Sequence, residues 1–417
     1  MKRRTFLRES ALLSAGFVVS SWHIVGNYRK PFITKAIEPL SLKKAEIPVL
    51  VLEGSPRQRG QVHGEELREK ISELVQIWKL GLGRQYWMDP DEYISEFLEN
   101  TNFPVAIKKW TPGLLEEVKG LAEGSGVDYE TMLAYQFVDE EWWYGMHKTW
   151  RLPIPDAKHC SALGVYGQEG LPNLVAQNLD IPAYTDRFQA LLDIKYKDSS
   201  LEALVFTYAG LISLCGMNNH GIGEVVNALL QLDHRVDGLP VAFINRGILE
   251  QTNHEEAVQF VKNIKHASGQ NYTIGSPEKI SAFECSANKV SAFVPYKGAK
   301  RMYHTNHPLV NDDQGIHRQF LKKWPERMQP KHPGNSEIRY AALEKRLKDP
   351  DKRITIDKVK ETLSSRDDPR NPVCRIRRKD GRGAFTSGCL IMELSQSPVL
   401  HLSPGPPCTT EFQTFTF

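Results

Sequence analysis

The sequence predicts an α+β protein in which a helical part precedes a β-rich part. Apolar residues recur at helical spacing over 59–80, and a second helix begins at Thr111-Pro112 and ends at Gly124-Ser125-Gly126. After residue 160, short runs of β-branched and apolar residues separated by turn residues predict strands. Strands in two blocks, with helices between and outside them, suit two sheets covered by helices.

The remaining elements follow in order along the chain. A first strand is expected at 47–52, and Asp128 is expected to cap a helix that runs to the aromatic residues at 142–144. Thr252-Asn253-His254-Glu255 is interpreted as the capping box of a helix ending at 264. The other expected elements are strands at 160–166, 174–180, 191–196, 203–208, 212–217, 222–229, 272–274, 280–285 and 289–294, helices at 241–251 and within 315–365, and a closing hairpin at 385–394 and 399–402.

Length and composition are those of an ordinary soluble globular protein. The chain has 417 residues, 41% hydrophobic and 25% charged, enough for two domains or one large layered domain. The net charge of +3 is too small to indicate a nucleic-acid partner. The basic run at 375–379 is short and is interpreted as a solvated loop.

The first 22 residues predict an export signal. Residues 2–8 (Lys-Arg-Arg-Thr-Phe-Leu-Arg) resemble a twin-arginine signal, and a mostly apolar run follows at 11–22. That run is shorter than the roughly 20 apolar residues of a membrane span, and no convincing A-x-A cleavage site follows. We expect the twin-arginine export machinery as a partner and the bacterial periplasm as the location, with the signal either removed or kept as an anchor. A cytoplasmic protein with a basic amphipathic tail is the alternative.

Six cysteines are present, without a CxxC pair or metal-type spacing. If Cys160 is a nucleophile, five remain, and an oxidising compartment permits disulfides that the sequence does not assign. Cys215, Cys285 and Cys389 lie in apolar, strand-like runs and are predicted to be buried thiols; the other two are Cys374 and Cys408.

A predicted hairpin places a thiol beside a carboxylate. Residues 160–166 and 174–180 are the expected strands, and the turn between them is centred on Gly170. In such an antiparallel pair, residues whose numbers sum to 340 face each other, so Cys160 is expected opposite Asp180.

This pair suits an N-terminal nucleophile. Cleavage of the His159–Cys160 bond gives Cys160 a free α-amine, whose pKa of about 7.7–8.0 suits a base that activates the thiol. Asp180 is expected to hold that amine by a hydrogen bond. Taken alone, the spacing favours a plainer interpretation, in which Cys160 is a buried small apolar residue and Asp180 a turn residue.

Five sequence blocks in order resemble the acyl-coenzyme A:isopenicillin N (6-aminopenicillanic acid) acyltransferase family of autoproteolytic N-terminal-nucleophile cysteine hydrolases. Each block alone is weak, and together they span roughly 49–407. They are 51–60 with His63-Gly64, 117–127, Cys160-Ser161 with Gln177-Asn178-Leu179-Asp180, 216–221 running to Asn227-Ala228-Leu229, and His304-Thr305-Asn306-His307.

The resemblance implies a four-layer αββα sandwich and a chain that is cut into two segments with different roles. Residues 23–159 would be an N-terminal (α) segment released by self-cleavage, and residues 160–417 the catalytic (β) segment, both within one domain. The family's oxyanion asparagine corresponds to Asn227, which follows an apolar strand; without the family, an ordinary strand-end asparagine would be the better interpretation. Asn178 is a candidate substrate-binding residue from the third block.

One feature of the family, a Ser-Arg pair, can be matched to this sequence in two ways. The fungal penicillin enzyme of the family has a Ser-Arg pair before its last hairpin. Counted from the final hairpin, Thr386 and Ser387 take those places and the arginine is lost. By local match, Arg382 is the arginine, followed by a two-residue insertion. All three remain candidate substrate-binding residues.

The two histidines at 304 and 307 raise two further interpretations. They are three residues apart, but no HExxH pattern or nearby carboxylate supports zinc, so we expect no metal. His307 is the better candidate for the pocket. A papain-like pair of Cys160 with His220 or His307 would need no cleavage; the hairpin and the family resemblance argue against it.

The sequence thus predicts an exported, self-processing cysteine hydrolase of linear amides. The substrate would be a small N-acylated amine or a peptide-like molecule, the acyl group would pass through a thioester on Cys160, and no metal or organic cofactor is required. Hydrolysis is favoured over transfer, because the periplasm holds little acyl-coenzyme A. The alternatives are an acyltransferase to an amine, a catalytically silent periplasmic binding protein, and an amidase or esterase directed at membrane lipids.

Overall fold

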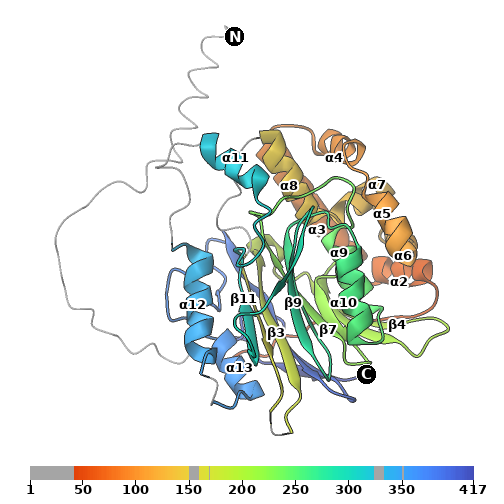
Figure 1. Cartoon of the computed structure of the whole chain (residues 1–417). Coiled ribbons are helices and arrows are strands. Elements are labelled where there is room, and N and C mark those ends of the chain that lie inside the picture. Colours follow the sequence, from red (N-terminus) through yellow and green to blue (C-terminus); the bar gives the residue numbers. More distant parts are fainter. Residues whose placement is uncertain (1–41, 150–158, 169, 324–332, 350–351) are drawn as a thin grey trace. The chain divides into compact units, whose positions relative to one another are not determined.

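Two β-sheets stack face to face, and helices cover the outer face of each (Figure 1). The computed structural model describes residues 42–149, 159–168, 170–323, 333–349 and 352–417. The predicted signal at 1–22 lies outside the described residues. None of the described helices combines the length and the apolar character needed to cross a membrane.

In the described part of the chain, eight strands form the first sheet and six form the second. The first sheet runs in the spatial order β1 (Val49–Leu52), β4 (Gln189–Lys195), β5 (Glu202–Tyr208), β6 (Cys215–Asn218), β7 (Gly223–Ala228), β8 (Gln270–Gly275), β9 (Ile280–Cys285), β10 (Val290–Phe293). The second runs β11 (Arg301–His304), β2 (His159–Val165), β3 (Asn173–Pro182), β12 (Ala384–Leu394), β13 (Val399–Ser403), β14 (Gln413–Phe415). All pairs are antiparallel except β1 with β4.

The helices divide between the two outer layers. The first sheet is covered by α2 (Pro56–Glu66), α3 (Arg68–Tyr86), α4 (Pro90–Glu99), α5 (Phe103–Trp110), α6 (Pro112–Ser125), α7 (Tyr129–Tyr135), α8 (Val138–Thr149), α9 (Val241–Leu249) and α10 (His254–Asn263). The second is covered by α12 (Asn335–Leu347) and α13 (Ile356–Leu363), while α11 (Gly315–Lys323) precedes α12 in the chain.

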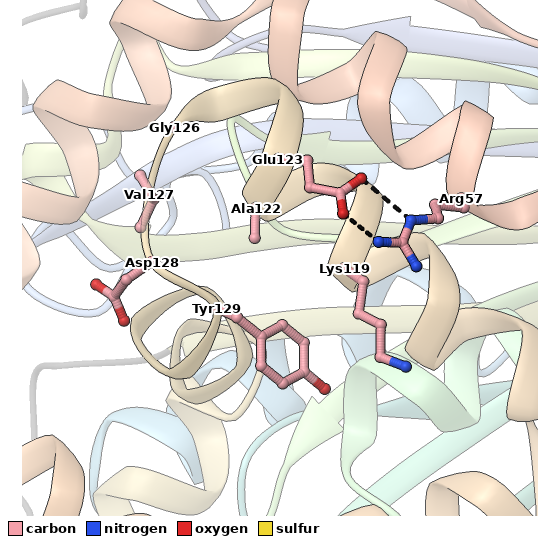
Figure 2. Close-up of a pocket in the computed structure, with 8 residues that line it drawn as sticks. All are labelled: Arg57, Lys119, Ala122, Glu123, Gly126, Val127, Asp128 and Tyr129. Atoms are coloured by element: carbon pink, nitrogen blue, oxygen red, sulfur yellow. Dashed lines mark hydrogen bonds and ion pairs between the residues drawn. The ribbon is translucent and has the colours of Figure 1, made fainter.

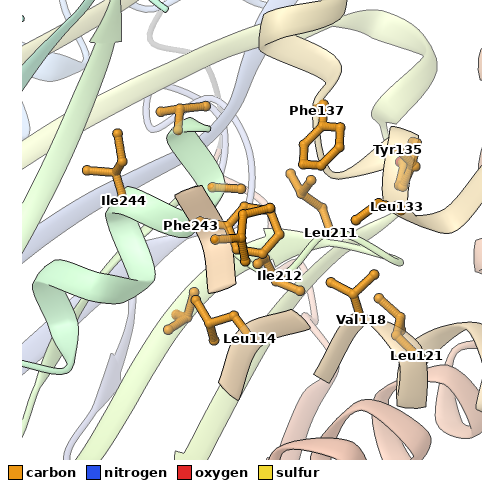
Figure 3. Close-up of a cluster of buried hydrophobic side chains, with 14 of the residues drawn as sticks. Leu114, Val118, Leu121, Leu133, Tyr135, Phe137, Leu211, Ile212, Phe243 and Ile244 are labelled. Carbon is orange, nitrogen blue, oxygen red and sulfur yellow. The ribbon is translucent and has the colours of Figure 1, made fainter. Parts of the chain in front are cut away.

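Three apolar cores correspond to the three interfaces between these layers. The helical core joins α2–α10 to the first sheet; Figure 3 shows part of it, with Val118, Phe137 and Phe243 among the clustered side chains. A second core lies between the sheets and includes Ala162, Leu179 and Met217. A third joins the second sheet to α12 and α13. The predicted αββα sandwich is therefore confirmed by the order of the layers.

The first two sequence blocks of the family resemblance form a helix contact. Helices α2 and α6 approach so closely that a Cβ atom on Gly60 would lie 1.9 Å from the backbone oxygen of Glu117. A Cβ on Gly120 would likewise lie 1.9 Å from the oxygen of Arg57. Glycine is needed at both positions because any side chain would push the helices apart.

Three local predictions were wrong by small amounts. The helix expected from Asp128 to the aromatic residues at 142–144 is two helices, α7 and α8. The single helix expected over 59–80 is two helices, which meet at Leu67, where φ is −114° and ψ 19°. The N-cap of α10 is Asn253, whose side chain accepts from the N–H of Glu256, so the predicted capping box is shifted by one residue. Thr252 instead donates to the carboxylate of Glu256.

Candidate active site

Cys160 is the second residue of β2, and its side chain points into the space between the sheets. Its strand neighbour Ala162 and its cross-strand partner Leu179 both belong to the inter-sheet core. Tyr208 of β5 and Cys215 of β6 both interact electrostatically with Cys160. Cys160 is 6% exposed. The thiol therefore lies between the sheets, facing the strands of the first sheet.

The predicted pairing of Cys160 with Asp180 is wrong by one residue. Cys160 pairs with Leu179, and Asp180 pairs with His159. Because successive side chains of a strand point to opposite faces, a one-residue shift moves a side chain to the other face. The carboxylate of Asp180 therefore lies on the outer face of the sheet, on the side of α12 and α13, and the thiol on the inner face.

The turn between β2 and β3 explains this shift. Pairing begins at Val165 and Leu174, and the loop between them is not symmetric about Gly170. The N–H of Gly167 donates to the side chain of Asn173 at 2.7 Å, and the N–H of Leu171 donates to Gln168 at 3.1 Å. These contacts fold the loop in a way that the turn residues alone do not specify.

Asp180 is buried among donors and cations. Thr386 of β12 donates to its Oδ1 at 2.6 Å, and Arg375 Nε lies 3.8 Å from Oδ2. Burial raises the pKa of Asp180 to about 6, although Arg339, Thr386 and Arg375 all act in the opposite direction. The carboxylate thus has a pKa closer to neutral pH than an exposed aspartate.

The structure separates the three candidates for the family's Ser-Arg pair. Thr386 pairs with Asp180 across β12 and β3, and Ser387 is the extra residue of a β-bulge between Thr386 and Gly388. The hydroxyl of Ser387 is buried and has no hydrogen-bond partner among the described residues. Arg382 lies exposed in the loop before β12. Two other arginines, 339 and 375, bring guanidinium groups to Asp180 instead.

Two residues that the sequence did not single out hold the backbone of Cys160. Asn306, after β11, accepts the N–H of Cys160 on its Oδ1 at 2.7 Å and donates from Nδ2 to the carbonyl of Ala228 at 3.0 Å. Arg339 of α12 donates to the Cys160 carbonyl at 2.6 Å and to Asn306 Oδ1 at 2.9 Å. The nitrogen of the predicted nucleophile is therefore bound to Asn306 rather than to Asp180.

Arg339 itself is held rigidly. Its side chain is fully buried, and it also donates to Ser161 Oγ at 2.9 Å and to Asn335 Oδ1 at 2.8 Å. Burial lowers its pKa to about 10, partly offset by Asp180 and Cys160. A cation fixed beside the nitrogen of Cys160 disfavours a second positive charge there.

Asn227 of β7 presents an unused donor to the same inter-sheet space. Its Oδ1 accepts from Asn271 of β8 at 3.1 Å, while its Nδ2 is buried and has no partner among the described residues. Gln177 of β3 binds both backbone groups of Val226, which fixes β7 against β3. An amide donor fixed in this way suits stabilisation of a developing oxyanion.

The remaining predicted residues have structural contacts. Asn178 lies on the outer face and donates to the carbonyls of Leu363 and Val373 at 2.7 and 2.9 Å. The ring of His307 contacts Ser336 Oγ at 2.8 Å, and burial lowers its pKa to about 4. His220 is exposed in the turn before β7.

The described residues contain no group of three or more His, Cys, Asp or Glu side chains that could hold a metal ion. His304 Nε2 instead contacts Glu284 at 2.8 Å. A cavity of about 540 Å³ lies outside this site, between α2, α6 and α7. Figure 2 shows the ion pair of Arg57 with Glu123 in its wall, and no Cys, Ser or Thr is among its lining residues.

Residues 169–368 match the family described as acyl-coenzyme A:6-aminopenicillanic acid acyl-transferase. The match covers just under half of the chain. It contains Asp180, Asn227, Asn306 and Arg339 but begins after Cys160. The description of that family names an acyl transfer. No curated protein matches the chain.

Solved structures resemble the chain only distantly. Two single-residue variants of a conjugated bile acid hydrolase from Clostridium perfringens share 14% and 15% identity at TM-scores of 0.40 and 0.41, covering 62% of this chain and 97% of theirs. A penicillin V acylase from Agrobacterium tumefaciens shares 14% identity at a TM-score of 0.38, covering 58% and 82%. Similarity this low carries no argument about activity.

The acyl-transferase family blocks gave partial signals for the missed residues. Asn306 lies within the fifth block, between the two histidines. Arg339 lies in a charged helical stretch and follows Cys160 by 179 positions. No local pattern marks it, because its partners come together only in the folded chain.

Proposed function

We propose that this protein is an exported, self-processing cysteine N-terminal-nucleophile hydrolase that cleaves small linear amides. The observation that carries the proposal is the bond from the Cys160 N–H to Asn306 Oδ1 at 2.7 Å. A fixed acceptor at this nitrogen is what a terminal amine needs if it is to act as the base for its own thiol.

Self-cleavage begins with an N-to-S acyl shift. The sulfur of Cys160 attacks the carbonyl carbon of His159, the carbonyl–nitrogen bond breaks, and the acyl group of His159 is left on sulfur. The thiol proton passes to the freed nitrogen, which becomes the α-amine of Cys160. Water then hydrolyses the thioester, giving a carboxylate on His159 and regenerating the Cys160 thiol. Asn306 would keep its acceptor on that nitrogen throughout, and Arg339 would hold the Cys160 carbonyl.

In turnover, the same atoms act on a substrate amide. The α-amine takes the proton from the thiol, the sulfur attacks the amide carbonyl, and the amine passes the proton to the leaving nitrogen. Asn227 Nδ2 would donate to the oxyanion. Arg339 would keep the α-amine neutral at working pH by disfavouring its charged form. Water releases the acyl group and regenerates the thiol.

Asp180 takes a different part from the one the sequence predicts. In the uncut chain it lies opposite His159, on the side of the bond that is lost. We assign it a positioning role through Thr386 and Arg339, rather than direct contact with the thiol. Acyl transfer is the second candidate, and the description of the matching family favours it. If an acceptor amine replaces water, the same thioester passes its acyl group to that amine.

The first test is intact-mass analysis of the full chain beside Cys160→Ala. Self-cleavage predicts two fragments in the wild type, the larger beginning at Cys160, and one uncut chain in the variant. Cys389→Ala removes a buried thiol elsewhere and is expected to cleave like the wild type. One uncut chain in all three proteins would rule out the N-terminal-nucleophile mechanism.

A second test separates the positioning residues from the chemistry. Asn306→Ala and Arg339→Met are expected to slow self-cleavage by about tenfold or more, because each removes a bond to Cys160.

Processed wild-type protein should then hydrolyse a panel of N-acyl p-nitroanilides of increasing acyl length. Acyl transfer would be favoured if the protein cleaves itself but hydrolyses none of the p-nitroanilides, and forms an N-acyl amine when an acceptor amine is added.

A further inference from the structure

Two cysteines outside the proposed active site lie close enough to be joined. Cys374 Sγ and Cys408 Sγ are 2.9 Å apart, and both residues are free thiols in this structure. A disulfide has a sulfur–sulfur distance of about 2.05 Å, so the two atoms need to move by less than about 1 Å. We propose that Cys374 and Cys408 form a disulfide that ties the segment before β12 to the segment after β13.

The chemistry of the two thiols differs in a way that suits bond formation. Cys374 is fully buried, whereas Cys408 is partly exposed. The pKa of Cys408 is lowered because Cys374 donates a hydrogen bond to it and Arg366 lies nearby. Burial raises the pKa of Cys374. Cys408 is therefore the thiolate that a small oxidant meets first.

A low-molecular-weight disulfide such as oxidised glutathione supplies the oxidising power. The Cys408 thiolate attacks one glutathione sulfur and releases one glutathione thiolate, leaving a mixed disulfide on Cys408. Cys374 then loses its proton to solvent and attacks Cys408 Sγ, releasing the second glutathione thiolate. Two protein thiols are oxidised and one glutathione disulfide is reduced to two thiols.

The bond would fix the segment that covers the outer face of β3. Val373, before Cys374, accepts from Asn178, and the N–H of Arg375, after it, donates to Thr386 Oγ1 at 2.8 Å. Thr386 in turn donates to Asp180. On the other side, the turn at 406–410 carries Cys408 and pairs with Lys43 through Thr409. A disulfide here ties the layer around Asp180 to the end of the chain.

Counting thiols tests the proposal. The full chain has six cysteines. After incubation with oxidised glutathione and denaturation in an alkylating agent, peptide mapping should show Cys374 and Cys408 joined and Cys215, Cys285 and Cys389 alkylated. The oxidised protein should unfold several degrees higher than the reduced protein, roughly 3–8 °C, because the bond closes a long loop.

Single substitutions give the matched controls. Cys374→Ser should leave one glutathione on Cys408, because the second exchange step has no thiol to complete it. Cys389→Ala should still form the bond. Two free thiols at 374 and 408 after oxidation, or a bond between either of them and another cysteine, would overturn the proposal. The same peptide map separates any glutathione adduct at Cys160, and such an adduct concerns the proposed nucleophile and not this disulfide.

Discussion

Two buried polar clusters in this protein differ in how completely their groups are paired. In the helical layer, Glu117 accepts from Arg59 Nη2 at 3.0 Å and from Arg246 Nη1 at 2.7 Å, and all three side chains are almost fully buried. Among their described polar atoms, Arg246 Nε alone lacks a hydrogen-bond partner. Around Cys160, by contrast, Asn227 Nδ2, Asp180 Oδ2 and Ser387 Oγ are buried without hydrogen-bond partners among the described residues.

Buried polar groups that are paired therefore have a structural role, and buried polar groups that are left unpaired around Cys160 have a role in the reaction. Breaking a paired buried charge costs stability, because the remaining charge is left uncompensated. A donor left unpaired in the native state costs stability already and is retained where a reaction uses it. We therefore expect substitutions in the Glu117 cluster to change folding and those around Cys160 to change rates.

The largest expected effect is on stability. Glu117→Gln should lower the free energy of unfolding by about 3–5 kcal/mol, because it leaves Arg59 and Arg246 buried without a carboxylate. Urea unfolding followed by circular dichroism measures it. Glu116→Gln, one residue earlier and 43% exposed, is the control and should change little. Equal losses in both variants would contradict the paired-cluster account.

Asn227→Ala should show the opposite profile. The rate of self-cleavage is expected to fall by about 10²–10³-fold, equivalent to about 3–4 kcal/mol of barrier, because one oxyanion donor is lost. The free energy of unfolding should fall by only about 1 kcal/mol, because the removed Oδ1 accepts one hydrogen bond from Asn271 and the removed Nδ2 bonds nothing in the described structure. Time courses of cleavage and urea unfolding measure the two quantities. A destabilised variant that cleaves at the normal rate would make Asn227 structural.

Gly60→Ala tests the close contact between α2 and α6. The added Cβ would lie 1.9 Å from the oxygen of Glu117, so the helices must separate, at an expected cost of about 1–3 kcal/mol or more. Gly81→Ala is a matched control in α3, because nothing lies within 4 Å of its Cβ position. That variant should gain up to about 1 kcal/mol. Denaturation midpoints compare them, and equal shifts would refute the contact argument.

The smallest effect concerns pH. The folded pKa of Asp180, about 6, is above its ordinary value of 3.8, so the folded protein binds the proton more tightly than the unfolded chain. Stability from this group is therefore gained as pH falls from about 6 to 4 and lost as pH rises through that window. Asp180→Asn should flatten this part of the stability curve, measured by unfolding at successive pH values.

His63, in the helical layer, should act in the opposite direction. Burial lowers its pKa to about 4, below the ordinary 6.5, so its contribution to stability is lost as pH falls through that range. The two groups partly offset each other in the wild type, which is why the aspartate variant is the informative one. An unchanged curve in Asp180→Asn would contradict the assigned shift.

The sequence by itself determined the architecture and most of the elements. Helical spacing in α6, the cap of α7 at Asp128, and apolar runs in β4 and β5 are local signals. The structure has α6, β4 and β5 close to where they were expected, and α7 begins directly after Asp128. The αββα order came from the family resemblance, since periodicity gives element types and not their stacking. The buried state of Cys215, Cys285 and Cys389 was also correct.

Only the tertiary structure decided which atoms meet. The register of β2 and β3 depends on side-chain contacts in their loop, and one residue of shift moved Asp180 to the other face of the sheet. Asn306 and Arg339 reach Cys160 from 146 and 179 positions away. Such contacts leave no local pattern, because they are fixed by packing of the second sheet against α12 and not by the residues that flank them.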